Sequence, residues 1–103
     1  MDSNDCAKIL KALGDDSRLK IVRFLLQGEK SVSEIVDFLK LGQPQVSHHL
    51  AILRSSGLVD TRREKNKIIN FINPKKRYIL KKKDIGLDLG CCSISFDEQN
   101  APA

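Results

Sequence analysis

Residues 31–64 read SVSEIVDFLKLGQPQVSHHLAILRSSGLVDTRRE, and this stretch decides the fold. Ser31 followed by Glu34 has the form of a capping box, in which each side chain bonds a free backbone N–H of the other residue. A helix is therefore predicted to begin at Ser31, and Leu41 and Gly42 interrupt its apolar pattern. The apolar positions at helical spacing are Val32, Ile35, Val36 and Leu39.

A second helix is predicted to begin near Gln43. Pro44 suits a first helical turn because its missing N–H would have no partner there, and Gly57 suits the left-handed position that ends a helix. The buried face is expected to consist of Val46, His49, Leu50 and Leu53. Gln45, Ser47 and His48 then point away from the core. Such a polar edge at a helix N-terminus is what enters a DNA major groove.

Two β-prone runs follow, at residues 58–63 and 68–72, and residues 64–67 join them. They predict a hairpin with a basic tip. Helix, turn, helix and hairpin together predict a winged helix-turn-helix, a mainly α fold with a small β-hairpin.

Helix pairs occur in many small proteins, so the helical pattern alone does not establish DNA as the partner. The distribution of charge favours DNA. Between Asp60 and Lys83 there are ten Lys or Arg and two acidic residues, a local charge of +8, whereas the whole chain carries +5. A basic run is often only a solvated surface. Its position beside the helix-turn-helix favours contact with phosphates.

Length and composition limit the architecture. A chain of 103 residues that is 41% hydrophobic supports one small core, and such a domain often gains burial by dimerising. We expect one domain over residues 1–96, with a thiol-bearing segment from about 84 to 96, and a disordered tail over 97–103. No apolar run reaches the roughly 20 residues of a membrane helix, and the acidic, polar start is unlike a signal peptide. A cytoplasmic location without a membrane partner is therefore expected.

The flanking segments have simpler patterns. Residues 6–13 predict a first helix with Cys6 on its apolar side, and Asp15 and Asp16 are placed to cap the next helix. After Asn73 and Pro74, at most a short basic helix over residues 75–83 is expected. The following run LDLGCCSISF, residues 87–96, is β-prone.

The runs KALGDDSRLKIVRFLL, at residues 11–26, QPQVSHHLAILRSSGLV, at 43–59, and FINP, at 71–74, resemble the ArsR/SmtB family of winged-helix repressors. The resemblance covers residues 7–74. It implies a non-enzymatic homodimer that binds imperfect palindromes in double-stranded DNA and releases them on binding a metal or metalloid ion. The family's base-reading positions fall on Gln43, Gln45, Ser47 and His48, where His48 replaces a more usual Arg. Its wing contacts fall on Arg62, Arg63, Lys65 and Lys67.

Three cysteines without a secretion signal argue against a disulfide framework and for free thiols. Two sensor sites of the family are missing, because residues 31–39 contain no Cys and no His follows His49. Cys91 and Cys92 remain, with Cys6. Their segment resembles arsenical-sensing family members that carry adjacent cysteines near the C-terminus.

Three thiolates suit As(III) or Sb(III), which take three sulfurs, better than Zn²⁺, which takes a fourth ligand. Adjacent residues of a strand face opposite sides, so Cys91 and Cys92 need a local distortion to share an ion, and Gly90 allows one. Cys6 is the candidate third ligand, from the same or the partner subunit. It is equally a candidate for a small packed hydrophobe.

The expected function is a homodimeric repressor that releases its operator on binding a trivalent arsenical. A thiol redox or persulfide sensor on the same fold stays open. A vicinal-thiol oxidoreductase or metallochaperone is disfavoured, because no Cys-x-x-Cys accompanies a βαβ pattern. A partner-binding module that lost DNA recognition is a further alternative. The family's long C-terminal dimerisation helix is expected to be shortened, since the chain turns β-prone soon after Lys83.

Overall fold

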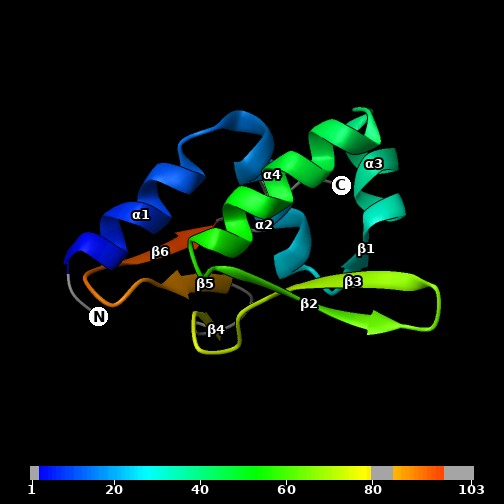
Figure 1. Ribbon diagram of the computed structural model, residues 1–103. Helices are drawn as coiled ribbons and strands as arrows, with labels where there is room; N and C mark the ends of the chain where they lie inside the picture. Colours follow the sequence, from blue (N-terminus) through cyan, green and yellow to red (C-terminus); the bar gives the residue numbers. More distant parts are fainter. Residues whose placement is uncertain (1–2, 80–84, 97–103) are drawn as a thin grey trace.

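The computed structural model describes residues 3–79 and 85–96. These residues form four helices and two three-stranded antiparallel sheets (Figure 1). The helices are α1 (Ser3–Leu13), α2 (Asp16–Leu26), α3 (Val32–Leu39) and α4 (Gln43–Ser55). The strands are β1 (Lys30–Ser31), β2 (Val59–Glu64), β3 (Lys67–Ile72), β4 (Arg77–Ile79), β5 (Ile85–Asp88) and β6 (Ser93–Phe96). The winged helix-turn-helix prediction is confirmed.

The predicted helix boundaries of the central motif are confirmed. The Ser31 N–H donates to Glu34 Oε1 at 3.0 Å, and the Glu34 N–H donates to Ser31 Oγ at 3.2 Å, which completes the capping box of α3. Lys40 ends this helix in the left-handed region with φ 59°. Helix α4 begins at Gln43, and Gly57 follows its end with φ 87°.

The first two helices differ slightly from expectation. Helix α1 begins at Ser3 rather than at Cys6 and carries Asp5 in its first turn, where an acidic side chain interacts favourably with the helix dipole. Asp15 caps α2 as predicted, accepting a hydrogen bond from the Arg18 N–H at 3.0 Å. The backbone N–H of Arg18 is also the main reason that the pKa of Asp15 lies below its ordinary value.

The predicted hairpin is present. Strands β2 and β3 pair from Val59 with Ile72 to Glu64 with Lys67, and β1 adds to the free side of β3, so that the strand order is β1-β3-β2. Lys65 turns the chain with φ 56°. Figure 1 shows this hairpin projecting as a wing beyond the helices.

The short basic helix allowed after Pro74 is not present over residues 75–79, because Lys75 and Lys76 lie in a turn and β4 begins at Arg77. Asn73 closes a tight turn instead: its side-chain Oδ1 accepts from the Lys75 N–H at 3.0 Å, and its carbonyl accepts from the Lys76 N–H at 2.8 Å. The chain then enters the second sheet, where pairing with β5 outweighs local helix preference. Residues 80–84 and the predicted tail over 97–103 lie outside the described residues.

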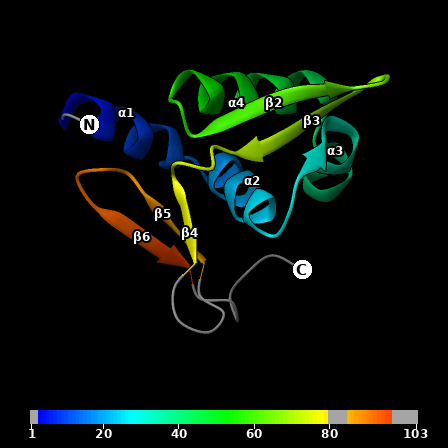
Figure 2. The ribbon, with the colours of Figure 1, turned by 90° about the horizontal axis from the view of Figure 1, so that it is seen from below.

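The second sheet has the order β4-β5-β6 and packs into the same core as the helices. Leu87 and Leu89 are completely buried there, together with residues from all four helices. Figure 2 shows this sheet beside α1 and α2, away from the wing. The β-prone pattern of residues 87–96 is confirmed by β5 and β6. Within the described ranges, no helix has the length and apolar character required to cross a bilayer.

Candidate functional site

The polar edge of α4 lies at the surface. Gln43, Gln45, Ser47 and His48 are all exposed, while Val46 between them is buried. The Gln45 side chain also closes the first turn of the helix, since its Oε1 accepts from the Gly42 N–H at 3.0 Å. Base contact by these four side chains stays a prediction.

His49 lies at the margin of the core rather than inside it, with 18% of its side chain exposed. Its Nδ1 is 3.3 Å from Arg18 Nη1 and 3.9 Å from Asp15 Oδ2. Arg18 Nε also donates to the Ala12 carbonyl of α1 at 2.7 Å. One arginine therefore joins the end of α1 to the middle of α4, a polar link that the apolar periodicity of α4 did not predict.

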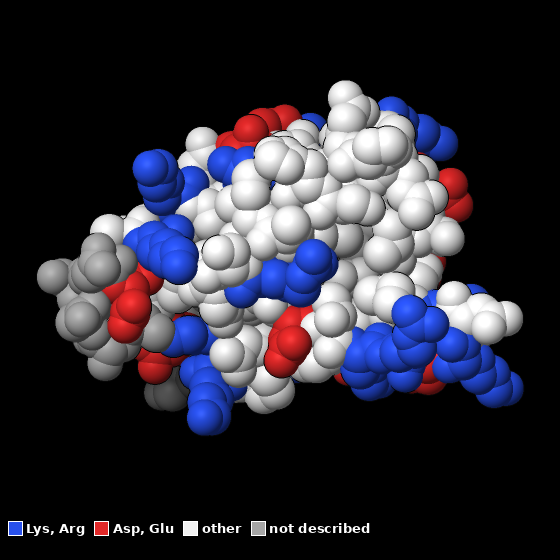
Figure 3. All heavy atoms as spheres, viewed as in Figure 1, with Lys and Arg blue, Asp and Glu red and all other residues white. Residues whose placement is uncertain are grey.

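The tip of the wing is strongly basic. Arg63, Lys65 and Lys67 are exposed on it, and Figure 3 shows Lys and Arg side chains gathered there, whereas the adjacent surface over α4 is largely uncharged. Lys81, Lys82 and Lys83 of the basic run lie outside the described residues. Phosphate contact by the wing stays a prediction.

Arg62 differs from the other basic wing residues because its guanidinium group is already paired. It forms ion pairs with Glu29, at 2.6 Å, and with Glu64, at 2.9 Å. Hydrogen bonds from Arg62 lower the pKa of Glu29, and the two carboxylates raise the pKa of Arg62. Glu29 lies 33 positions away in sequence, and no local signal pointed to it.

The three cysteines meet in one subunit. Cys6 is 1% exposed in α1 and forms a disulfide with Cys91, with a Cα–Cα distance of 6.1 Å. Cys92 is exposed and free, and its Sγ lies 4.0 Å from Cys6 Sγ. All three sulfurs lie within 4.8 Å of one another. The prediction of free thiols is therefore wrong for Cys6 and Cys91, because sequence spacing does not reveal a pairing 85 positions apart.

A turn between β5 and β6 presents Cys91 and Cys92 to α1. Gly90 adopts φ 91°, a region that glycine enters at little cost, and its N–H donates to Asp88 Oδ1 at 2.9 Å. The Leu89 N–H bonds the Cys92 carbonyl at 2.9 Å, while the Leu89 side chain is buried in the core. The two cysteines thus lie in a turn at Gly90, where the opposite-face restriction of a regular strand does not apply.

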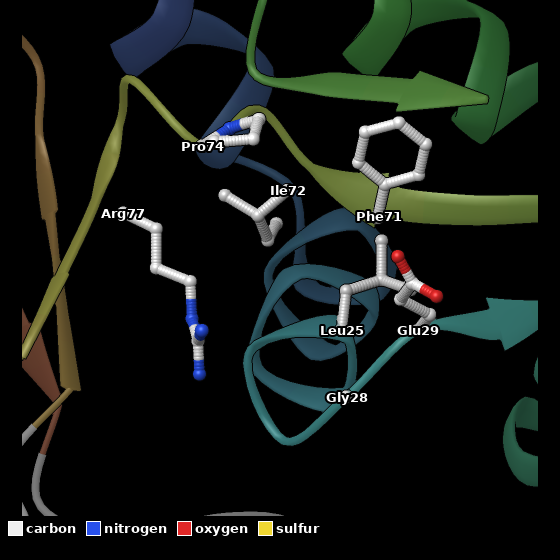
Figure 4. Close-up of a pocket in the computed structure, with 7 residues that line it drawn as sticks. All are labelled: Leu25, Gly28, Glu29, Phe71, Ile72, Pro74 and Arg77. Atoms are coloured by element: carbon white, nitrogen blue, oxygen red, sulfur yellow. The ribbon is translucent and has the colours of Figure 1, made fainter. Parts of the chain in front are cut away.

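A pocket of about 450 Å³ lies between the end of α2, β3 and β4 (Figure 4). Both charged residues that line it have protein partners: Glu29 pairs with Arg62, and Arg77 Nη2 donates to the Leu26 carbonyl at 3.2 Å. The remaining lining residues are Leu25, Gly28, Phe71, Ile72 and Pro74. The pocket is a hollow beneath the base of the wing, and sequence patterns gave no sign of it.

Comparison with known proteins identifies the fold family. The model of the bacterial regulatory protein arsR family matches residues 15–61. HlyU from Vibrio cholerae N16961, also solved in a reduced form, is 39% identical over 69% of this chain and 77% of that chain, with a TM-score of 0.67. The chain belongs to the arsR family. This is a family of transcriptional regulators, so the oxidoreductase and metallochaperone alternatives lose their support.

Other members of the arsR family have informative names. The transcriptional repressor BigR from Xylella fastidiosa is 39% identical over 69% of this chain and 72% of that chain, with a TM-score of 0.64. A homodimeric winged helix-turn-helix DNA-binding domain, Mb0332 from Mycobacterium bovis, is 35% identical over 67% of this chain and 64% of that chain, with a TM-score of 0.65. The arsenical resistance operon repressor of Staphylococcus aureus is 37% identical over 65% of this chain and 64% of its own length.

The match to this arsR family model stops short of the sulfur cluster. Residues 15–61 include the helix-turn-helix but none of the three cysteines. The chain spans 54% of the curated biofilm growth-associated repressor of Xylella fastidiosa and 66% of a Methanocaldococcus jannaschii regulator. Any ligand of this chain must therefore be inferred from its own side chains.

Proposed function

We propose that this protein is a homodimeric repressor that binds double-stranded DNA and loses operator affinity when Cys6 and Cys91 are oxidised to a disulfide. The observation that carries the proposal is the Cys6–Cys91 bridge between α1 and the β5–β6 turn. BigR is a repressor, Mb0332 has a homodimeric DNA-binding domain, and HlyU has a structure named as reduced. These relatives support the proposal that this protein is a dimeric regulator with a reduced form, in which its cysteines are thiols.

In the DNA complex, the exposed edge of α4 reads base edges in the major groove and the wing contacts phosphates. A two-fold dimer places two α4 helices in successive grooves, so the operator is an imperfect palindrome. The base-reading residues are Gln43, Gln45, Ser47 and His48. Arg63, Lys65 and Lys67 supply phosphate contacts.

The exposure of the two cysteine residues assigns the order in which they react with a hydroperoxide. Cys91 is exposed, so its thiolate attacks the peroxide oxygen, forms a sulfenic acid and displaces the alkoxide or hydroxide, which takes up a proton. Cys6 is buried and reacts second: its thiolate attacks the sulfenic sulfur, and hydroxide leaves to become water. The two thiols lose two electrons, which reduce the peroxide.

A contiguous set of contacts connects the bridge with the DNA-reading helix. Cys6 and Ala12 belong to α1, Arg18 bonds the Ala12 carbonyl, and the same Arg18 contacts His49 of α4. Tying α1 to the β5–β6 turn therefore acts on the helix that positions α4. Allosteric couplings are typically about 1–3 kcal/mol, which corresponds to roughly 5- to 150-fold in affinity.

The test measures DNA binding by fluorescence anisotropy in the thiol and disulfide states. The probe is a duplex of roughly 30 base pairs enriched from a random pool by the reduced protein, long enough for two half-sites one helical turn apart. Peroxide should weaken binding at least about fivefold, and dithiothreitol should restore it. Cys6→Ser and Cys91→Ser should abolish the response, whereas Cys92→Ser should retain it. Equal affinity of both states of the wild type contradicts the proposal.

A second candidate inducer is a trivalent arsenical, As(III) or Sb(III). Reduction of the bridge leaves three thiols whose sulfurs start within 4.8 Å of one another, a donor set suited to a thiophilic ion with three sulfur ligands. The Cys92→Ser variant distinguishes the two candidate inducers, a peroxide and a trivalent arsenical. Arsenite added to the reduced protein without oxidant should release DNA only if Cys92 is present, because the ion needs all three sulfurs. Release by arsenite from Cys92→Ser would exclude the three-thiolate site.

A further inference from the structure

Arg62 makes an unusually complete set of contacts for a residue on an exposed wing. Its Nη1 and Nη2 donate to the two carboxylate oxygens of Glu29 at 2.6 and 2.7 Å, a forked geometry that is stronger and more directional than a single ion pair. Its Nε and Nη2 donate to Glu64 Oε2 at 3.1 and 2.9 Å. Two carboxylates thus engage all three nitrogens of one guanidinium group.

These contacts connect two separate parts of the molecule. Arg62 and Glu64 belong to β2, whereas Glu29 lies in the connection between α2 and β1. The Phe71 ring of β3 lies 5.7 Å from the Arg62 guanidinium carbon and adds a cation–π contact. The hairpin is therefore held to the end of α2 by a charged residue.

The base of the wing is anchored by β1–β3 pairing and by Val59 and Ile72, which are buried in the core, but a hollow lies beside this base. Glu29 and Phe71 both line the pocket of about 450 Å³ (Figure 4). Next to this hollow, the Arg62–Glu29 pair bridges from β2 to the α2–β1 connection. Beyond the buried base of the sheet, the angle of the exposed part of the wing relative to the helices depends in addition on this polar contact.

We propose that Arg62 is a positioning residue that sets the angle of the wing through Glu29, and that it is not a phosphate ligand. The proposal rests on DNA binding by the wing, as stated under the proposed function. Two carboxylates engage the Arg62 guanidinium, whereas among the described residues no ion pair involves Arg63, Lys65 or Lys67, so Arg62 has a different task. Arg63, with Lys65 and Lys67, contacts phosphates, and Arg62 holds the hairpin that carries them.

The two roles of Arg62 predict opposite signs for Glu29→Gln. A phosphate-binding Arg62 would be released from its carboxylate partner, and the loss of a negative charge near DNA would tighten binding. A positioning Arg62 would lose its anchor, and the wing would spend less time in the binding geometry. Arg62→Lys separates the roles as well, because it keeps the charge but loses the forked geometry.

The experiment measures duplex affinity of the reduced protein at several salt concentrations, with the enriched duplex as probe. Glu29→Gln and Arg62→Lys should each weaken binding about three- to fivefold, the range expected of a well-oriented surface ion pair. Arg62→Gln should leave the slope of log K against log salt unchanged, whereas Lys67→Gln should reduce it by about one. Asp60→Asn is the matched control: it removes a β2 carboxylate that bonds its neighbour Thr61 and should not weaken binding.

A second readout does not depend on DNA. The amide order parameter of Asn66, at the wing tip, should fall in Glu29→Gln and Arg62→Lys and stay unchanged in Asp60→Asn. Tighter DNA binding by Glu29→Gln, or an unchanged order parameter in both variants, overturns the proposal. A wild-type chain that binds no duplex overturns the proposed function, and the order parameters then still decide whether Arg62 holds the wing.

Discussion

The two sheets of this protein each have three strands and both reach the core, but the first carries an exposed hairpin and the second ends in the turn that holds the cysteines. The β1-β3-β2 sheet extends outward, and most residues of β2 are exposed or half-buried. The β4-β5-β6 sheet buries Leu87 completely and leads into a turn whose Leu89 is also buried. The first sheet carries exposed basic side chains at its tip, which the proposed function assigns to DNA phosphates. The second holds Cys91 against Cys6, so it serves contacts within the molecule.

The comparison teaches that the residues that identify the family and the proposed sensing cysteines lie in different parts of the chain. The arsR family match ends at residue 61, within the first sheet. The second sheet lies where the family resemblance led us to expect a shortened C-terminal helix. A regulator can keep its DNA-reading half and change its inducer by changing the segment that packs against α1.

The largest expected effect concerns the bond that fastens the second sheet to α1. The Cys6–Cys91 bridge closes a loop of 85 positions, which restricts the unfolded chain. The oxidised protein should be more stable than the reduced protein by about 4–5 kcal/mol, the loop-entropy value for this length. Urea unfolding with and without reductant measures the difference. Cys92→Ser should preserve it, and an identical urea midpoint in both states would argue against the bridge.

The next effect tests the difference in burial between Leu87 of the second sheet and Ile68 near the tip of the wing. Leu87→Ala truncates a side chain that is 0% exposed and should cost about 2–5 kcal/mol. Ile68→Ala on the wing, where the side chain is 38% exposed, should stay within about 0.5 kcal/mol. Thermal and urea unfolding of the reduced proteins provide both values. Similar costs at the two positions would contradict the difference in burial between Leu87 and the exposed wing.

A smaller effect is expected at the junction between β1 and α3. Ser31→Ala removes the cap of α3 and should cost about 1 kcal/mol in urea unfolding. The hydrogen bond from the Ser31 N–H is the main cause that lowers the pKa of Glu34 below its ordinary value of 4.5. Because the folded pKa is lowered, this stabilisation is present above about pH 4.5 and is lost as the pH falls through the folded value. Glu34→Gln should therefore show less acid destabilisation than the wild type between pH 6 and pH 3, and equal losses would contradict it.

The smallest effect belongs to Glu29. Its ion pair with Arg62 is half-exposed and screened by solvent, so Glu29→Gln should leave the urea midpoint of unfolding nearly unchanged. The same variant should still alter DNA binding, because wing angle and global stability are different quantities. A large loss of stability would mean that Arg62 and Glu29 support the fold as a whole.

The sequence predicted the features that depend on neighbours along the chain. The capping box at Ser31, the start of α4 at Gln43 and the β2–β3 hairpin follow from local hydrogen bonds and periodicity. The bend at Gly90 was also anticipated. The strand at Arg77 was mistaken for part of a helix, because pairing with β5 is decided by a segment later in the chain.

The candidate site was predicted in composition but not in connectivity. Cys6, Cys91 and Cys92 were grouped correctly, as their sulfurs show, yet the disulfide was not foreseen. The partner of Arg62 and the contact between Arg18 and His49 were missed for the same reason. Each joins residues more than 30 positions apart, and hydrophobic periodicity carries no information about polar pairs at that separation.

The separation of Cys6 from Cys91 also orders events during biosynthesis. Chains are made from the N-terminus at about 5–20 residues per second, so Cys6 is synthesised roughly 4–17 s before Cys91, 85 positions later. By then the residues of α1 to α4 and of the wing have been translated. The nascent chain can therefore build its DNA-reading half while Cys6 still has no partner, and every new molecule passes through a thiol stage before the bridge can form.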